Sequence, residues 1–426
     1  MRHKILTVYS VAALLGVVTG CVGSYFILAI QQLTHLMSRG FNYAAACGWP
    51  VGLVSAIISM LMIYTAWLLV KWFATEASGS GVQEIEGALL HQRPIFWRRL
   101  LPVKFMSGAL AISSNLVVGR EGPTIQMGGN LGEMMGEWFK LSRHHCDVLI
   151  AAGSAAGLAA AFNAPLAGIL FVLEEMRDKF SFSFTNFTAV AVCCVMSVIM
   201  LHLIVGSEPA IQMSVFNLPN VPSLWLFFIL GMVVGFVGLL FNRVLMSSLF
   251  LIDQLTPVKR DLYVLMVGLL IGFLAYLQPE AVGGGYAIIE KSLTMHSSFF
   301  ILLTILVVRF ITTMLSYNTG VSGGIFAPML ALGTLLGLVT SFVFQWIMND
   351  TTVHPGMFAV AGMGALFAAV VRAPITGIVL VVEMTQNYSL ILPLMVTCLT
   401  ATTVVQLAGN APIYTQLLRR TLNKMK

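Results

Sequence analysis

An arginine and a glutamate stand between glycines in an apolar part of the sequence, Gly119-Arg120-Glu121-Gly122-Pro123. Ionised side chains in such a stretch are costly and usually serve a function. Glycine lets another group approach the backbone amides closely, and Pro123 favours the start of a helix. Free N–H groups at a helix N-terminus bind anions. We interpret the segment as an anion site with the Glu121 carboxylate as a titratable plug. An ion pair with Arg120 is the alternative, although adjacent helical residues point apart.

Four of the 17 acidic residues belong to regions that recur in an internal repeat and in which the helices are expected to be broken: Glu121, Glu174, Glu175 and Glu383. Glu383 occupies the position of Glu174 in an internal repeat, whereas Met384 occupies that of Glu175. The repeated pair therefore favours a structural role for Glu174 and Glu383, and a functional role for Glu175. A helix-end pair with Arg177 is the structural alternative for Glu174 and Glu175.

The composition is that of a membrane protein. Of 426 residues, 58% are hydrophobic and only 9% charged, and the mean hydropathy is +0.90. Soluble domains carry close to a quarter charged residues. Because stretches long enough to span a bilayer recur along the chain, we predict an all-α polytopic membrane protein.

The formal charge of +6 does not indicate nucleic-acid binding, because the basic residues lie at the termini and in short connections. This placement predicts that both termini are cytoplasmic. The basic residues concerned are Arg2, Lys4, Arg93, Arg98, Arg99, Lys104, Arg419, Arg420, Lys424 and Lys426. The six cysteines lack metal-like spacing, so we expect packing roles for them and neither a metal site nor a cofactor.

Two kinds of apolar segment can be distinguished. Some are long enough to cross the membrane, namely 5–36, 51–73, 186–206 and 224–250. Others are short and interrupted by glycine or proline, namely 76–90, 104–118, 148–162 and 165–175. Broken helices are tolerated at membrane depth only inside the protein or along a cavity, and in transporters they mark the substrate site.

The chain contains an internal repeat. Residues 153–169 recur as 362–378, and glycines and a proline of the 119–132 segment recur in 324–337. We therefore predict one membrane domain, 1–426, made of two halves at about 30–206 and 222–408, without a cytoplasmic regulatory domain. Such repeats are often inverted, with the binding site between them near the midplane. The repeat also predicts a second anion-facing turn at Gly323 to Pro328.

Three glycine-rich motifs and a late tyrosine give the sequence a family resemblance. Gly79-Ser80-Gly81, Gly119 to Pro123, Gly324-Ile325-Phe326-Ala327-Pro328 and Tyr414 resemble the CLC chloride channel and transporter family in order and spacing. The resemblance extends from about residue 70 to the C-terminus. Among the members, the chain is most similar to bacterial chloride/proton exchangers, in particular the voltage-gated ClcB type. The resemblance implies the CLC-type fold, in which broken helices meet at an anion site.

The resemblance also implies the site residues. The Ser80 hydroxyl and the Tyr414 phenol would bind a central chloride, and the amides of Ile325 and Phe326 would complete that site. Amides near Glu121 would form an outer site, which the ionised Glu121 carboxylate occupies as a gate. The implied chloride-binding set is Ser80, Gly81, Arg120, Glu121, Gly122, Ile325, Phe326 and Tyr414.

Glu175 matches the inner proton-accepting glutamate of the exchangers, which favours chloride/proton antiport. The implied partners are chloride, protons and membrane lipid. The implied assembly is a homodimer in the bacterial inner membrane with one pathway per subunit. A passive voltage-gated chloride channel of the same fold is the nearest alternative. An intramembrane hydrolase using Ser154 is an alternative of another class. A fluoride exporter is disfavoured, because Ser80 and Tyr414 match the chloride pattern.

Three positions depart from the family pattern. Gln83 and Ser322 each replace a usual proline, and Lys179 adds charge after the Glu174-Glu175 motif. Neither Gln83 nor Ser322 removes an expected ligand, but both are expected to loosen a turn.

Overall fold

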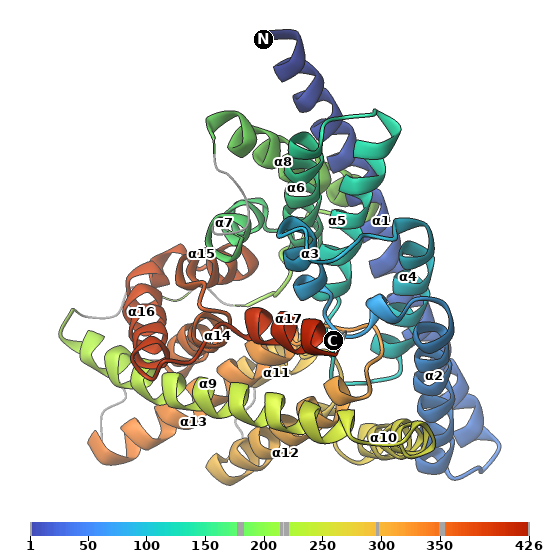
Figure 1. The fold of residues 1–426 in the computed structure, drawn as a ribbon. Coiled ribbons are helices and arrows are strands. Elements are labelled where there is room, and N and C mark those ends of the chain that lie inside the picture. Colours follow the sequence, from blue (N-terminus) through green and yellow to red (C-terminus); the bar gives the residue numbers. More distant parts are fainter. Residues whose placement is uncertain are drawn as a thin grey trace.

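The computed structural model describes residues 2–176, 183–213, 216, 221–294, 298–348 and 354–424. Within these ranges the chain is helical, with four short 3-10 turns and two isolated backbone bridges in place of a sheet (Figure 1). Nine of the described helices are long and apolar enough to cross a membrane. The prediction of an all-α polytopic membrane protein is confirmed.

The helices of the first half are α1 (Arg2–Ala46), α2 (Val51–Phe73), α3 (Val82–Leu89), α4 (Trp97–Ser113), α5 (Glu121–Trp138), α6 (Arg143–Phe162), α7 (Pro165–Glu175) and α8 (Phe184–Ile204). The second half begins with α9 (Leu224–Asp253), α10 (Pro257–Leu277), α11 (Tyr286–Thr294), α12 (Phe299–Asn318) and α13 (Phe326–Met348). It ends with α14 (Pro355–Val371), α15 (Pro374–Thr385), α16 (Ile391–Leu407) and α17 (Ile413–Asn423).

One of the segments expected to be short is not. Residues 148–162 form the later part of α6, which has 20 residues and is long enough to span. The polar residues from Arg143 to Asp147 form its first turn, which the apolar pattern alone did not reveal. The short helices α3 and α7 agree with the prediction, having 8 and 11 residues.

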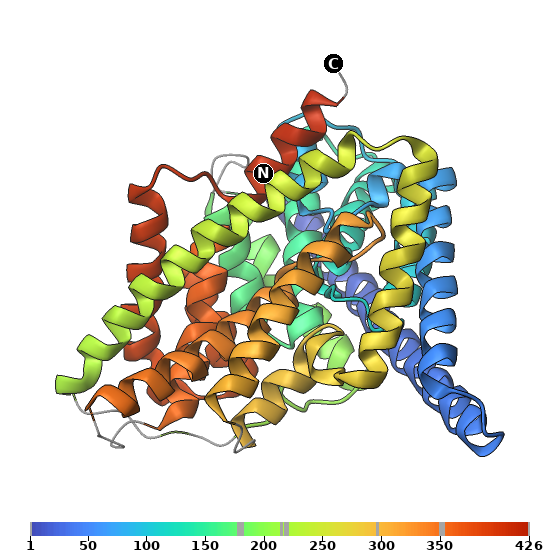
Figure 2. The ribbon, with the colours of Figure 1, turned by 90° about the horizontal axis from the view of Figure 1, so that it is seen from below.

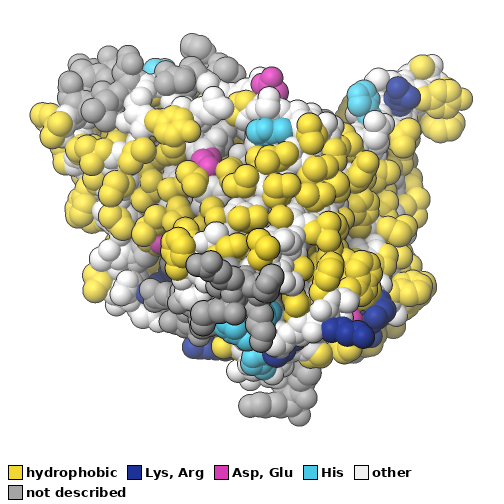
Figure 3. Space-filling model, turned by 90° about the horizontal axis from the view of Figure 1, so that it is seen from above, with side chains coloured by type: hydrophobic (Ala, Val, Ile, Leu, Met, Phe, Trp, Pro, Cys, Tyr) yellow, Lys and Arg dark blue, Asp and Glu magenta, His cyan; other side chains and the backbone are white. Residues whose placement is uncertain are grey.

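Burial separates central helices from peripheral ones. The apolar windows of α6 and α13 are 89% buried inside the protein, whereas that of α10 is only 28% buried. Figure 2 shows α10 beside α2 at one edge of the molecule. On the face shown in Figure 3, hydrophobic side chains cover a broad area, and the few Lys and Arg side chains lie mostly near the edges of that area. The peripheral helices therefore present apolar side chains to lipid, while α6 and α13 form the centre.

The internal repeat is visible in the helix packing. In the first half, α5 packs on α6 so closely that a Cβ on Gly128 would lie 2.0 Å from the Gly153 carbonyl oxygen. In the second half, α13 packs on α14 in the same way, and a Cβ on Gly333 would lie 2.3 Å from the Gly362 oxygen. Small residues allow such close helix contacts in a membrane. These glycines are therefore packing residues at equivalent places in the two halves.

A reciprocal pair of carboxylates joins the halves. The Glu174 carboxylate at the end of α7 accepts hydrogen bonds from the amides of Ile375 and Thr376, at 3.0 and 2.6 Å, in the first turn of α15. The Glu383 carboxylate near the end of α15 accepts from the amides of Leu166 and Ala167, at 3.1 and 2.8 Å, in the first turn of α7.

This reciprocal contact confirms the structural role predicted for Glu174 and Glu383. Each carboxylate satisfies N–H groups that have no acceptor within their own helix. Because the end of each helix lies at the start of the other, α7 and α15 run antiparallel. Equivalent helices of an inverted repeat are expected to run in this way.

We predict that Glu174→Ala and Glu383→Ala each lower the free energy of unfolding by about 1–3 kcal/mol, because each leaves two helix-terminal amides without an acceptor. Thermal unfolding of the purified protein in detergent measures the effect. Glu208→Ala, which changes an exposed glutamate, is the matched control and should leave the midpoint unchanged. Equal midpoints for all three variants would contradict the capping role.

Candidate functional site

The three glycine-rich motifs meet at the centre of the molecule. The Gly119 amide donates to the Gly324 carbonyl at 2.7 Å, and the Gly324 amide donates back at 2.9 Å. Gly79 pairs with the neighbouring loop, accepting from the Gly323 amide at 3.1 Å and donating to the Val321 carbonyl at 2.9 Å. The two halves thus build one site, as the repeat predicts.

Glu121 is the first residue of α5, and its side chain is fully buried. One carboxylate oxygen, Oε1, accepts a hydrogen bond from the Tyr286 hydroxyl at 2.5 Å. The other, Oε2, accepts from the Ala327 amide at 3.4 Å, in the first turn of α13. The carboxylate therefore lies where the free N–H groups of a helix N-terminus bind an anion. The Ala327 amide belongs to the turn from Gly323 to Pro328, the predicted second anion-facing turn, and it donates to the Glu121 carboxylate.

Two hydroxyl groups close to this point have no hydrogen-bond partner in the described part of the chain. Ser80 and Tyr414 are fully buried, and their hydroxyls lie near each other, but neither meets the geometry of a hydrogen bond to a described group. The electrostatic neighbours of the Tyr414 phenol include Ser80, Glu175 and Glu121. Buried donors without an acceptor are costly and rare, so this pair is suited to an anion that is not part of the protein.

Ile325 and Phe326 lie at the start of α13, where the first amides have no intrahelical acceptor. Both residues are fully buried. The Phe326 ring packs against Phe162, Phe171 and Phe367, with centroids 5.3, 6.2 and 4.4 Å away. This aromatic cluster keeps the helix end dry, which strengthens the field of its amides.

The loop that carries Ser80 depends on glycine conformations. Gly79 and Gly81 have φ values of +64° and +85°, in the region that favours glycine. Gly81 precedes α3, and a Cβ there would lie 2.0 Å from Oε1 of Gln126. In the structure Gly81 shapes the loop, and its part in chloride binding stays a prediction.

Glu175 ends α7, and its side chain is only 7% exposed. It is one of the charged groups in the electrostatic surroundings of Tyr414, as Glu121 is. The alternative partner Arg177 is outside the described residues, as is Lys179.

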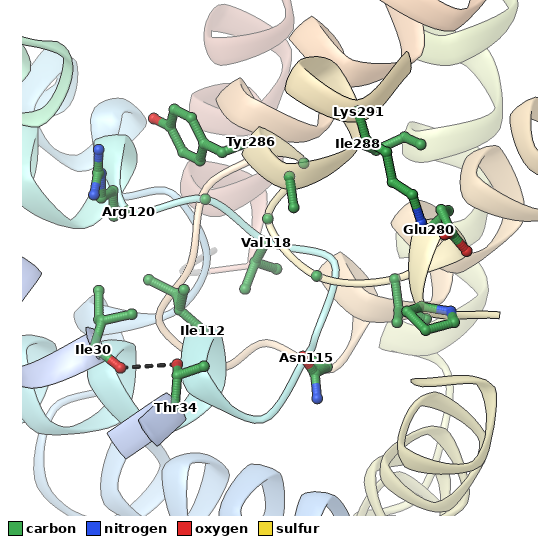
Figure 4. Close-up of a pocket in the computed structure, with 17 residues that line it drawn as sticks. Ile30, Thr34, Ile112, Asn115, Val118, Arg120, Glu280, Tyr286, Ile288 and Lys291 are labelled. Atoms are coloured by element: carbon green, nitrogen blue, oxygen red, sulfur yellow. Dashed lines mark hydrogen bonds and ion pairs between the residues drawn. The ribbon is translucent and has the colours of Figure 1, made fainter. Parts of the chain in front are cut away.

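Two cavities lie beside Arg120, the residue next to Glu121. One, of about 400 Å³, is lined by Arg120, Tyr286, Glu280 and Lys291 (Figure 4). Lys291 forms an ion pair with Glu280, and this hydrogen bond lowers the pKa of the Glu280 carboxyl. The other, of about 310 Å³, is also lined by Arg120 and Tyr286. Among the described residues Arg120 makes no salt bridge with Glu121; its guanidinium lies over the Tyr286 ring, 4.8 Å from the centroid.

A basic cavity lies on the C-terminal side of the site. Its volume is about 860 Å³, and its charged lining residues are Asp253, Arg260, Arg419, Arg420 and Lys424. An adjoining cavity of about 400 Å³ shares three of these basic residues and reaches Ser78 and Gln83 beside the Ser80 loop. Excess positive charge in a cleft raises the local concentration of anions.

Sequence reasoning missed three residues that support the site. Lys104, expected in a basic connection, is instead fully buried in α4, and its ammonium donates to the carbonyls of Ala77 and Gly79 at 2.9 and 2.8 Å. Arg309 in α12 and Tyr286 in α11 were not singled out. A basic residue within an apolar run, such as Lys104 or Arg309, was the available signal, because such charges are usually functional.

The structure corrects the expectation for Ser322. Its hydroxyl donates to the Ala77 carbonyl at 2.8 Å, and its amide donates to the Ser107 hydroxyl at 3.3 Å. A proline could not make these bonds. The turn is therefore tied more firmly here, whereas the effect of Gln83 stays a prediction.

Ser154 is placed for packing. Its hydroxyl donates to the Ile150 carbonyl at 2.8 Å, and a Cβ on Gly129 would lie 2.6 Å from it. A nucleophilic serine needs a base that takes its proton. The Ser154 proton is instead directed at a backbone carbonyl of the same helix, which argues against the hydrolase alternative.

Comparisons with known proteins agree with this geometry. The model of the family described as voltage gated chloride channel matches residues 60–406. The H(+)/Cl(-) exchange transporter ClcA of Vibrio parahaemolyticus is 44% identical over 427 residues, which cover 99% of this chain and 91% of that protein. The protein of the same name from Citrobacter koseri is also 44% identical, covering 98% and 89%. The narrower resemblance to the ClcB type stays a prediction, since these relatives carry the name ClcA.

Solved structures match the fold. A slow cyanobacterial Cl-/H+ antiporter superposes with a TM-score of 0.94 at 39% identity, over 98% of both chains. A CLC-type fluoride/proton antiporter superposes with a TM-score of 0.79 at 19% identity, over 97% of this chain and 98% of that one. The second likeness shows the fold alone. The predicted CLC-type fold is confirmed.

We predict that Gly122→Ala lowers chloride affinity about tenfold or more, since the loss of one hydrogen bond to an ion has this magnitude. A Cβ on Gly122 would lie 2.4 Å from the Ser80 hydroxyl oxygen, so this donor must move. Isothermal titration of chloride into the purified protein measures the affinity. Gly40→Ala, where a Cβ meets nothing within 4 Å, is the control. Unchanged affinity in Gly122→Ala would exclude Ser80 as a ligand.

Proposed function

We propose that this chain, which belongs to the voltage-gated chloride channel (CLC) family, exchanges chloride for protons across a membrane. The observation that carries the proposal is the position of the Glu121 carboxylate. It is fully buried and accepts a hydrogen bond from an amide at the N-terminus of α13, as a bound anion would. A group that occupies an anion site and can take up a proton connects the two ions.

Chloride is held in this proposal by neutral donors. A full positive charge in contact with the ion in a low-dielectric interior would bind it too tightly for release. The Ser80 and Tyr414 hydroxyls and the first amides of α13 provide a weaker field. The buried ammonium of Lys104 does not need to contact the ion, because it is bonded to the carbonyls of Ala77 and Gly79.

Coupling follows from competition for the same donors. The ionised Glu121 carboxylate occupies the outer site and closes the path. When a proton neutralises it, the carboxyl group loses its attraction to the helix N-terminus and moves out, so that chloride takes its place. Chloride occupancy and protonation are then linked, because each favours the state that the other requires.

Glu175 supplies the inner end of the proton path. It lies at the end of α7 and is one of the charged groups in the surroundings of Tyr414. In this proposal protons and chloride share only the part of the route near Glu121. A passive channel of the same fold has no need for a second buried acid. The relatives named exchange transporter and antiporter favour exchange as well.

We place the protein as a homodimer in the bacterial inner membrane, with lipid around its apolar helices. All the groups of the proposed pathway come from one chain, so each subunit would hold a complete pathway. The basic cavity beside α17 supports a cytoplasmic C-terminus, because cytoplasmic segments carry an excess of Lys and Arg.

Glu175→Gln is expected to lower proton movement by about 100-fold or more, since an amide cannot relay a proton, and to leave chloride flux in place. Proteoliposomes under an imposed chloride gradient, with a pH electrode and a chloride electrode, give both rates. Glu290→Gln makes the same chemical change at an exposed position of α11 and should behave as the wild type. Absence of proton movement in the wild type would instead identify a channel.

Glu121→Gln should abolish both proton exchange and the pH dependence of chloride flux, because the uncharged amide cannot act as a titratable anion mimic. Chloride flux measured between pH 4 and 8, roughly the range in which a carboxyl and its environment titrate, tests this. Ser154→Ala is the control for the hydrolase alternative and should keep pH-dependent exchange. Loss of activity in Ser154→Ala together with normal pH dependence in Glu121→Gln would exclude the transport proposal.

A further inference from the structure

The second half of the chain contributes a hydrogen bond to the gate. Tyr286, the first residue of α11, places its hydroxyl 2.5 Å from Oε1 of Glu121. A hydrogen bond to an ionised acceptor at this distance is among the stronger kinds in proteins. It stabilises the carboxylate in the position that closes the path, and it is lost when the carboxyl group leaves.

The loop before Tyr286 is held firmly in place. The Arg309 guanidinium donates to the carbonyls of Glu280, Val282 and Gly283, at 2.9, 2.9 and 2.6 Å. The Gly283 amide donates to the Asn115 carbonyl at 2.8 Å, which ties the loop to the first half. The hydroxyl of Tyr286 is therefore preorganised toward Glu121.

The Tyr286 ring also lies between the Glu121 carboxylate and the two cavities beside Arg120. Both cavities have Arg120 and Tyr286 in their lining, and Glu121 is fully buried beyond them. In Figure 4 the two side chains approach each other at one side of the larger cavity. The Arg120 guanidinium covers one face of the ring at 4.8 Å, and the Phe162 ring lies 6.5 Å from it.

The charged and titratable groups that face Glu121 are few. They are Arg120 next to it, Tyr286 from α11 and Tyr414 from α17. On α4, Lys104 is directed at the Ala77 and Gly79 carbonyls. On α3, Glu84 is paired with Arg93, at 2.8 Å. Within the described ranges, the Tyr286 hydroxyl is thus the one side-chain group that donates a hydrogen bond to the Glu121 carboxylate.

We propose that Tyr286 is a positioning residue that latches the ionised Glu121 carboxylate in the anion site and so sets the pH at which the pathway opens. The inference rests on the exchange function proposed above. Tyr286 keeps its own proton throughout. When a proton binds to Glu121, the carboxylic acid accepts the phenol hydrogen bond less strongly, and the side chain is released.

The direction of the effect follows from the state that the bond stabilises. The phenol favours the ionised, closed form of Glu121. Its removal leaves that form less stable, so the carboxyl group takes up a proton at a higher pH. Tyr286→Phe should therefore open the pathway at a less acidic pH and raise chloride turnover near neutrality.

Chloride flux of Tyr286→Phe in proteoliposomes, measured against pH, tests the proposal. The midpoint of acid activation is expected to rise by about one pH unit, the size of one hydrogen bond to a charged group. Tyr263→Phe removes another partly buried phenol, whose hydroxyl lies away from the gate and donates to the Leu315 carbonyl at 2.9 Å, and should keep the wild-type midpoint.

The double variant Glu121→Gln with Tyr286→Phe shows whether the effect passes through the gate. If Tyr286 acts as a latch, its replacement changes neither the pH profile nor the turnover in the Glu121→Gln background. A changed turnover there would assign Tyr286 to general packing and overturn the proposal. Thermal unfolding of each variant verifies that it is folded.

The results of these experiments distinguish the role of Tyr286 from the exchange function on which it rests. A wild type without proton exchange would reject the proposed function. A wild type that exchanges protons, together with a Tyr286→Phe midpoint equal to that of the wild type, would reject the latch alone.

Discussion

The placement of a buried carboxylate at a helix N-terminus is the interaction on which the rest of the site depends. Within the described part of the chain Glu121 has no cationic partner in contact with its oxygens; it accepts hydrogen bonds from the Tyr286 hydroxyl and the Ala327 amide. Such donors are strong enough to hold an anion away from water, yet they can be given up when the charge is neutralised. In the proposed mechanism the same donors suit chloride and carboxylate, so that one can replace the other.

This arrangement requires both halves of the chain. The Gly119 and Gly324 backbones bond to each other, which places the start of α5 beside the start of α13. Farther from the site, Glu174 and Glu383 cap the first turns of each other's helices. The repeat therefore does more than duplicate a fold. It brings two helix N-termini to one point, where one half alone would offer a single weak anion site.

The sequence predicted the parts of this structure that depend on local chemistry. Glycines before a helix, the repeat, and the separation of Glu175 from the repeated Glu174 indicated the site and its two acids. The partners that lie far away in the chain could not be predicted. Tyr286 follows three glycines in a connection and carries no local signal of a contact with Glu121. The hydrogen bonds of Ser322 to Ala77 and Ser107 depend on the tertiary structure, so they could not be predicted from the sequence. Without them, the serine in place of the usual proline was expected to loosen the turn.

The buried cations explain how the site becomes attractive to anions without binding them too tightly. Lys104 and Arg309 are both fully buried, and each donates to carbonyl oxygens of a loop that shapes the pathway. These bonds occupy the Lys104 ammonium and the two terminal nitrogens of Arg309, so both groups are held by the protein's own carbonyls. They also offset the negative ends of the loop carbonyls, which would otherwise repel chloride. In the proposed mechanism the positive charge thus acts through the loops that hold Ser80 and Tyr286, and contact with the ion is left to neutral donors that can release it.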